Sequence, residues 1–120
     1  MFTQTEYKPL RITKLDFFNE LPKGGNELMI ELATNVMMPG DLAEKQFLLK
    51  YDLKIHDNNE KFKLYFTAKT QVTYTDDFEN LDALRSAIDD FVPTITPEVQ
   101  KLLKKITEDF GINPIDVSFE

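Results

Sequence analysis

The feature that most constrains this chain is a pair of alternating segments on either side of the residues DNNE (57–60). Apolar residues occupy every second position before these four residues and again after them. They are Phe47, Leu49, Tyr51, Leu53 and Ile55, followed by Phe62, Leu64, Phe66 and Ala68. Because successive side chains of a strand point to opposite faces, the pattern predicts a long antiparallel hairpin with one apolar and one polar face.

The residues between the two segments predict a register for this hairpin. Asn tolerates the positive φ angles of a two-residue primed turn, so we expect Asn58 and Asn59 to form the loop. Ile55 would then lie opposite Phe62. A slip of one residue would turn one apolar set to solvent, so the register should be well specified.

Two further strands are expected before the hairpin. Leu10 and Ile12 keep one phase of alternation, whereas Leu15 and Phe17 keep the other. This change of phase predicts a strand over about 9–19 with a bulge near residues 13–14. The turn-forming residues LPKGGN (21–26) follow, and residues 27–36 read as another strand.

The periodicity changes after residue 76. Apolar residues recur every three or four positions from Leu81 to Phe91, behind Asp76 and Asp77 as helix caps, which predicts a helix that ends at Pro93.

A second helix is expected from Thr96 as N-cap, with Pro97 at its first position and Gly111 as a left-handed C-terminal cap. Residues 112–119 should lie extended along the body. The sequence therefore predicts a single domain over 1–120 with a two-layer α+β fold, a four-stranded antiparallel sheet followed by two helices.

Composition excludes several classes of function. The chain has no Cys, which excludes disulfides and thiolate metal sites and favours a reducing compartment. It has no long apolar run, so we expect neither a signal peptide nor a membrane span. A formal charge of -7 disfavours nucleic-acid binding. We expect a cytoplasmic protein.

The residues also offer no catalytic apparatus. His56 is the only histidine, and Lys61, its expected cross-strand neighbour, has the wrong charge to raise its basicity. The acidic residues of 76–90 lack the spacing of a calcium loop and are explained by helix capping and solvation. We therefore expect no enzyme, no metal and no cofactor.

Apolar residues are in surplus for one thin sheet. Ten Phe and four Tyr are present, and pairs such as Phe17-Phe18 and Met37-Met38 place one side chain on each side of a strand. One member of each pair leaves the primary core. Either a second protomer covers these side chains or they form a binding surface.

The order of the expected elements resembles the SecB-like fold of bacterial protein-export chaperones over essentially the whole chain. The segments that carry the resemblance are RITKLDFFNEL, VPTITPE and GINPIDVSFE. Their most telling residues are Arg11, Ile12, Asp16, Glu20, Pro93, Ile95, Gly111, Pro114, Val117 and Phe119.

The resemblance implies a homo-oligomer, a dimer or a tetramer, whose apolar grooves hold unfolded polypeptide without ATP. Our candidates for the groove are Phe17, Phe18, Met37, Met38, Phe78 and Phe91. It also implies docking on the translocation ATPase through acidic residues of the outer sheet face, to which Asp16 and Glu20 correspond. The polar face of the fourth strand carries Lys instead, which puts this docking in doubt. The alternative is a non-catalytic interaction module, oligomeric or associated with a phage or a toxin-antitoxin system, that uses the same scaffold for one specific partner.

Overall fold

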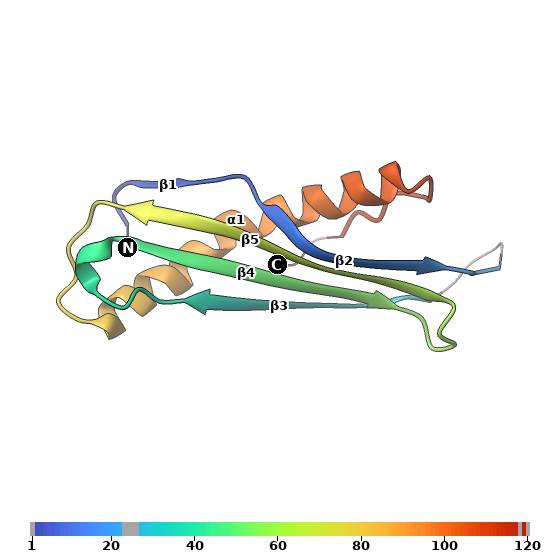
Figure 1. Cartoon of the computed structure of the whole chain (residues 1–120), viewed down its shortest axis with the longest axis horizontal. Coiled ribbons are helices and arrows are strands. Elements are labelled where there is room, and N and C mark those ends of the chain that lie inside the picture. The colour runs from blue at the N-terminus through green and yellow to red at the C-terminus, as the bar shows by residue number, and fades with distance from the viewer. Residues whose placement is uncertain (1, 23–26, 118, 120) are drawn as a thin grey trace.

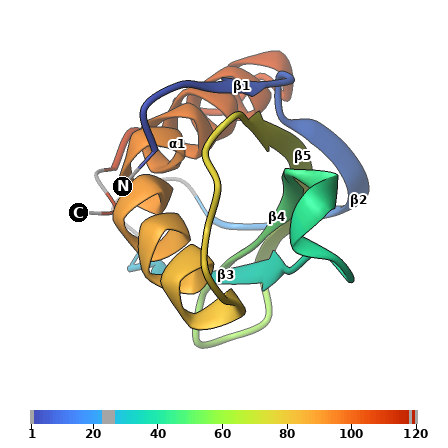
Figure 2. The same cartoon turned by 90° about the vertical axis from the view of Figure 1, so that its left-hand side faces the viewer.

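The computed structural model describes residues 2–22, 27–117 and 119. They form an antiparallel sheet with one long helix across one face, in an elongated body of 55 × 23 × 23 Å (Figures 1 and 2). The strands are β1 (Thr5–Tyr7), β2 (Arg11–Asn19), β3 (Met29–Met37), β4 (Gln46–His56) and β5 (Phe62–Tyr74). The helix is α1 (Leu81–Asp109), and a single 3₁₀ turn, η1 (Leu42–Glu44), precedes β4. The predicted α+β class and antiparallel sheet are confirmed.

The predicted counts of strands and helices are wrong. The described residues contain five strands and one α-helix. The additional strand, β1, pairs with the end of β5, where Thr5 lies opposite Tyr74. Three residues are too few to show an alternating pattern, so tertiary pairing alone defines this strand. β1 and β2 both lie along one side of β5, and β4 and β3 follow on the other side.

The predicted bulge in β2 is confirmed. Ile12 lies opposite Ala68 and Lys14 opposite Thr67, which leaves Thr13 as the extra residue. Since the bulge adds one residue, Leu15 and Phe17 face the same side of the sheet as Ile12.

The predicted hairpin register is wrong by two residues, although both apolar sets lie on the expected face. Ile55 pairs with Leu64 and His56 with Lys63. The loop is longer than two residues because the Asp57 carboxylate accepts hydrogen bonds from the backbone N–H groups of Lys61 (2.9 Å) and Phe62 (3.0 Å). The positive φ angle falls at Glu60 (56°) rather than at an Asn.

The two predicted helices are one helix of 29 residues that contains both Pro93 and Pro97. Its first and last parts point in different directions (Figure 2), as expected where Pro interrupts the hydrogen-bond ladder. The helix continues because buried residues on both sides of the break, Ile88 and Ile95 among them, pack into the same core. Tertiary packing therefore outweighs the local stop signal.

The predicted N-cap of α1 is wrong, and its predicted C-terminal Gly cap is confirmed. Asn80, not Asp76 or Asp77, is the N-cap, and its side chain accepts a hydrogen bond from the Ala83 N–H at 2.8 Å. Asp76 instead accepts hydrogen bonds from Thr3. Gly111 follows the helix with φ 74°, the predicted left-handed conformation.

The last described residues run back along the helix without regular structure. The Ile115 N–H donates to the Thr107 hydroxyl at 2.9 Å, and the Gln100 amide donates to Asp116 at 2.8 Å. This agrees with the extended tail expected from the sequence. Of the predicted turn at 21–26, residues 23–26 lie outside the described residues.

The core lies between the sheet and α1. Its fully buried side chains come from β4, β5 and the inward face of the helix. The largest are Phe47, Leu49, Tyr51, Leu53, Ile55, Leu64, Leu84, Ile88, Ile95 and Leu103. Among the described helices there is none with the length and apolar character that crossing a membrane requires.

Candidate functional site

Exposed apolar side chains fall into groups on the two faces of the sheet. The large ones that are at least a third exposed are Tyr7, Leu15, Phe17, Phe18, Met29, Met37 and Leu81. Leu15 and Phe17 face the helix layer but lie at the edge of the sheet, where they remain 42% and 37% exposed. Exposed apolar area at such positions marks a surface that another chain can cover.

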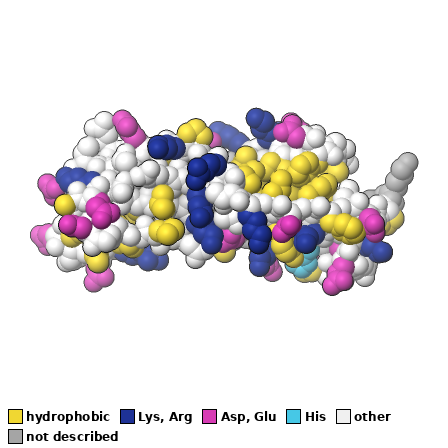
Figure 3. Space-filling model, viewed as in Figure 1, with side chains coloured by type: hydrophobic (Ala, Val, Ile, Leu, Met, Phe, Trp, Pro, Cys, Tyr) yellow, Lys and Arg dark blue, Asp and Glu magenta, His cyan; other side chains and the backbone are white. Residues whose placement is uncertain are grey.

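An apolar area is visible in Figure 3 between β2 and the C-terminal half of α1. Phe17 connects β2 to the end of α1 in this area, since its ring stacks on the ring of Phe110 and meets the edge of Phe62. Farther along, a hollow of about 230 Å³ is lined by Tyr7, Pro9, Leu10 and Leu102 together with the charged side chains of Glu98, Lys101 and Lys105. We call this surface the apolar strip. It consists of Tyr7, Leu10, Leu15, Phe17, Leu102 and Phe110.

A free strand edge borders the apolar strip. In the described part of the chain β2 pairs only with β5, so its other side has open backbone groups. The Glu20 N–H donates to the Lys61 carbonyl. In the register of β2 and β5, the even-numbered residues of β2 after the bulge therefore form the hydrogen-bonded pairs with β5. Hydrogen-bonded and non-hydrogen-bonded pairs alternate in an antiparallel ladder, so the N–H and C=O groups of Leu15 and Phe17 point to the free edge.

The predicted residues Phe78 and Phe91 lie toward the end of the molecule opposite the hairpin turn, where the ring of Phe91 also meets that of Tyr7 of the apolar strip, with centroids 6.4 Å apart. Both pack on Phe2, with ring centroids 5.5 Å and 5.8 Å away, and Phe2 also contacts Phe47 and Tyr74. Phe78 and Phe91 are therefore partly buried in an aromatic cluster that closes one end of the core.

The predicted pairs of adjacent apolar residues divide between the two faces, as strand geometry requires. Phe17 belongs to the apolar strip, whereas Phe18 lies on the outer face opposite Lys63. Met37 is 51% exposed on the outer face beside Leu48, and Met38 packs partly against the core. The six predicted groove residues are thus not brought together in one place.

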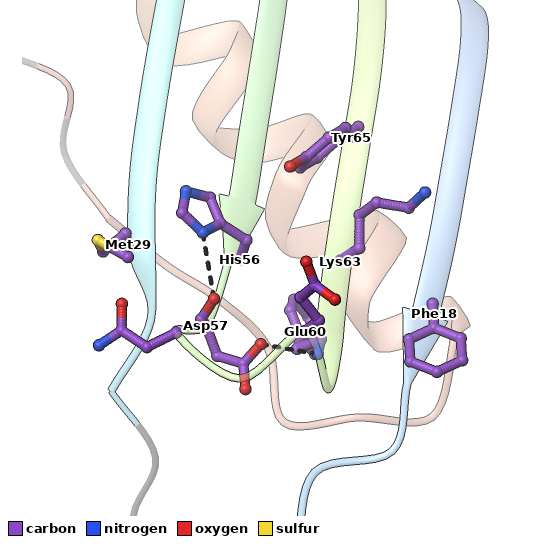
Figure 4. Close-up of a pocket in the computed structure, with 9 residues that line it drawn as sticks. Phe18, Met29, His56, Asp57, Glu60, Lys63 and Tyr65 are labelled. Carbon is purple, nitrogen blue, oxygen red and sulfur yellow. Dashed lines mark hydrogen bonds between the residues drawn. The ribbon is translucent and has the colours of Figure 1, made fainter.

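A second hollow, of about 610 Å³, lies on the outer face at the hairpin end (Figure 4). Phe18 and Met29 stand on its two sides, with His56, Lys63 and Tyr65 between them. His56 Nδ1 lies 3.3 Å from the carbonyl oxygen of Asp57, and the cross-strand neighbour of His56 is Lys63. The described residues hold no group of three or more His, Asp or Glu that could bind a metal ion.

Asp57 at this end is a structural acid. Burial raises the pKa of Asp57, but the hydrogen bonds from the N–H groups of Phe62 and Lys61 outweigh burial and hold the pKa below its usual value. The carboxylate is thus held ionised as the anchor of the loop.

The predicted docking residues Asp16 and Glu20 are both exposed. Asp16 lies on the outer face opposite Tyr65, in a small hollow that Asp52, Lys14 and Lys54 also line. Glu20 follows the end of β2, and its N–H donates to the Lys61 carbonyl. Asp16 therefore lies among side chains of both charges, and the hollow does not include Glu20.

Sequence reasoning missed Tyr7, Leu15 and Phe110 as members of the apolar strip. The sequence shows that these residues are apolar and that the alternation changes phase in β2. The same pattern is typical of residues buried in a core, so it does not indicate an exposed surface. Their exposure depends on how far α1 covers the edge of the sheet, which the alternating pattern does not encode.

No family model matches this sequence, and no curated protein matches it either. The structure is similar to that of the SecB-like chaperone Rv1957 of Mycobacterium tuberculosis, in complex with a ChAD peptide from the Rv1956 HigA1 antitoxin. The TM-score is 0.67 at 13% identity, over 97% of this chain and 87% of that one. A protein of unknown function from Streptococcus agalactiae matches with a TM-score of 0.47 and 10% identity, over 97% of this chain and 98% of the other.

Proposed function

Because this chain has the SecB-like fold, we propose that it is a chaperone-like protein that binds unfolded or partly folded polypeptide without ATP. The observation that carries the proposal is the apolar strip, whose members Leu15 and Phe17 are still more than a third exposed beside a free strand edge. A similar fold in complex with a peptide supports it. We expect the protein to act in the cytoplasm and to form a dimer or tetramer.

An extended polypeptide would add to β2 as a further strand. The outward N–H and C=O groups of Leu15 and Phe17 would bond its backbone, and every second side chain of the polypeptide would pack on the apolar strip. Backbone bonding is independent of sequence, which suits a protein that accepts many clients. Of the six predicted groove residues, Phe17 takes part directly and Phe18 and Met37 offer apolar contacts on the outer face.

The expected affinity is modest. Fully burying a Leu or Phe side chain contributes about 1.5–3 kcal/mol, and Leu15 and Phe17 are already more than half covered, so each retains about 1 kcal/mol. Ordering the client costs free energy as well. Reversible capture with release by dilution follows from these magnitudes.

A second candidate function is a module dedicated to one partner segment. The neighbour's complex with a peptide from a single antitoxin favours it. Such a module would use the apolar strip in the same geometry, but its affinity would depend on one sequence. Asp16 and Glu20 stay predictions as docking residues in both cases.

Light scattering of an unrelated, aggregation-prone client in its reduced form tests the proposal. The wild-type protein should delay aggregation, and the double variant Leu15→Ser and Phe17→Ser should lose most of this effect. Leu81→Ser is the matched control, because Leu81 is 48% exposed at the start of α1, away from the apolar strip. If the wild type leaves the aggregation curve unchanged, the general chaperone function is wrong and the dedicated module is favoured.

A further inference from the structure

The outer face of the sheet places like charges directly opposite one another. Lys50 of β4 lies opposite Lys69 of β5, and Lys69 lies opposite Arg11 of β2. Three positive side chains therefore form one row across three adjacent strands. The Cβ atoms of directly opposed residues are about 4.5–5.5 Å apart, and like charges at this distance destabilise a sheet.

Neighbouring carboxylates neutralise only part of the positive charge of this row. Lys50 Nζ lies 3.8 Å from Asp52 Oδ2, but Asp52 also accepts hydrogen bonds from the Thr67 hydroxyl (2.6 Å) and the Asn35 amide (3.5 Å). Within the described residues neither Arg11 nor Lys69 forms an ion pair with a carboxylate. The row thus retains most of its positive charge.

The rest of the outer face adds no positive charge, so the excess lies in the row itself. Dark blue side chains form a belt across the middle of this face in Figure 3. By register, the cations on the outer face are Arg11, Lys14, Lys50, Lys54, Lys63 and Lys69, and the carboxylates are Glu6, Asp16, Glu31 and Asp52. A face with excess positive charge on a chain of net charge -7 is a local departure from the whole molecule.

We infer that this cationic face, centred on Arg11, Lys69 and Lys50, docks an acidic segment of a partner protein. The row repels itself in the free protein and would be stabilised by carboxylates laid across it. The inference does not rest on the proposed function, because the apolar strip lies on the helix side of the sheet and the cationic face on the other.

The observations favour a polypeptide over a nucleic acid as the occupant. Apolar side chains border the cationic row at both ends of the face, with Phe18 and Met29 toward the hairpin turn and Leu48 and Met37 at the other end. These suit a segment with apolar residues next to its carboxylates. The net charge of -7 repels a long polyanion, whereas a short acidic segment experiences mainly the charges within a screening length of about 8–10 Å.

Fluorescence anisotropy with a labelled deca-glutamate peptide at an ionic strength of about 0.1 M tests the inference. The wild type should bind the peptide, and added salt should weaken binding. Lys69→Glu should lower the affinity at least tenfold. This variant should fold well, because it replaces two repulsive contacts by attractive ones, and its urea midpoint should lie above that of the wild type.

Arg85→Glu is the matched control, since it makes the same change of charge on an exposed part of α1. It should bind the peptide as the wild type does. An equal loss in Arg85→Glu, or no binding by the wild type, would overturn the inference. Tighter binding of a single-stranded oligonucleotide of equal charge would also overturn it, and so would self-association that Lys69→Glu abolishes, because the face would then belong to a nucleic acid or to a second copy.

Discussion

The ring of Phe17 in β2 stacks on the ring of Phe110, the residue that caps the end of α1, with centroids 4.3 Å apart and an interplanar angle of 25°. This contact joins the edge strand to the end of the helix and forms one end of the apolar strip. Phe17 and its neighbour Phe18 differ in this respect, since Phe18 faces the other side of the sheet. Comparing variants of Phe17 and Phe18 therefore tests whether β2 packs on the end of α1.

We predict a coupling of about 0.5–1.5 kcal/mol between Phe17→Ala and Phe110→Ala in a double-mutant cycle, which is the usual contribution of an aromatic pair. Urea unfolding of the two single variants and the double variant measures it. The cycle of Phe18→Ala with Phe110→Ala is the control and should give additive changes. Coupling of equal size in both cycles would contradict the arrangement of β2 on α1.

Removing the Tyr51 hydroxyl should stabilise the fold. The side chain is fully buried, and its hydroxyl has no hydrogen-bond partner among the described residues. Tyr51→Phe removes this polar atom without changing the packing, so we expect the free energy of unfolding to rise by about 1 kcal/mol. Tyr65→Phe, on the half-buried outer face, is the control and should change the urea midpoint little.

The same variant should change the response to alkaline pH. Burial raises the pKa of Tyr51 to about 12, and the nearby Thr96 hydroxyl, which lowers it, does not cancel this rise. The unfolded chain releases the proton near pH 10, so the fold loses stability as the pH rises from about 10 to 12. Urea midpoints at pH 8 and at about pH 11 should differ less for Tyr51→Phe than for the wild type; an equal loss would show that Tyr51 does not contribute.

The Asp57 carboxylate should make the hairpin sensitive to acid. Its pKa lies below the usual value, because the hydrogen bonds from the Phe62 and Lys61 N–H groups outweigh burial. A lowered pKa contributes stability that is present above about pH 4 and is lost as the pH falls through the folded-state value. We expect Asp57→Asn to lower the melting temperature at neutral pH and to flatten its decrease below about pH 4. Glu60→Gln, in the same loop, serves as control; a wild-type acid response in Asp57→Asn would exclude this role.

Deleting Thr13 should destabilise the fold far more than substituting it. The bulge at Thr13 brings Ile12 and Leu15 to one face, and without it one side of β2 must turn its apolar residues to the outer face. Re-exposing one such side chain costs about 2 kcal/mol. Thr13→Ala retains the extra residue and should cost less than about 1 kcal/mol. Urea unfolding of the two variants measures the difference, and equal stability would show that the bulge does not set the phase.

Features set by local chemistry could be predicted from the sequence. The faces of the hairpin follow from alternation, the bulge follows from the change of phase at Thr13, and the cap follows from the conformational freedom of Gly111. Each of these depends on a few neighbouring residues.

Features set by tertiary contacts could not be predicted in the same way. The hairpin register depends on the Asp57 carboxylate rather than on the Asn residues of the loop, and α1 continues through Pro93 because both of its parts are buried on one sheet. The apolar strip depends on where the helix leaves β2 uncovered. In the cationic row, Lys69 alternates with apolar neighbours like any solvated strand residue, and only the register places it between Arg11 and Lys50.

The elongated shape sets a length scale for any polypeptide that lies along this molecule. An extended chain advances about 3.3–3.6 Å per residue, so the 55 Å long axis accommodates a segment of about 16 residues. Shorter segments would leave part of the surface open to a second occupant. A longer unfolded stretch would extend past the ends and recruit further copies of the protein, so stoichiometry should increase stepwise with client length.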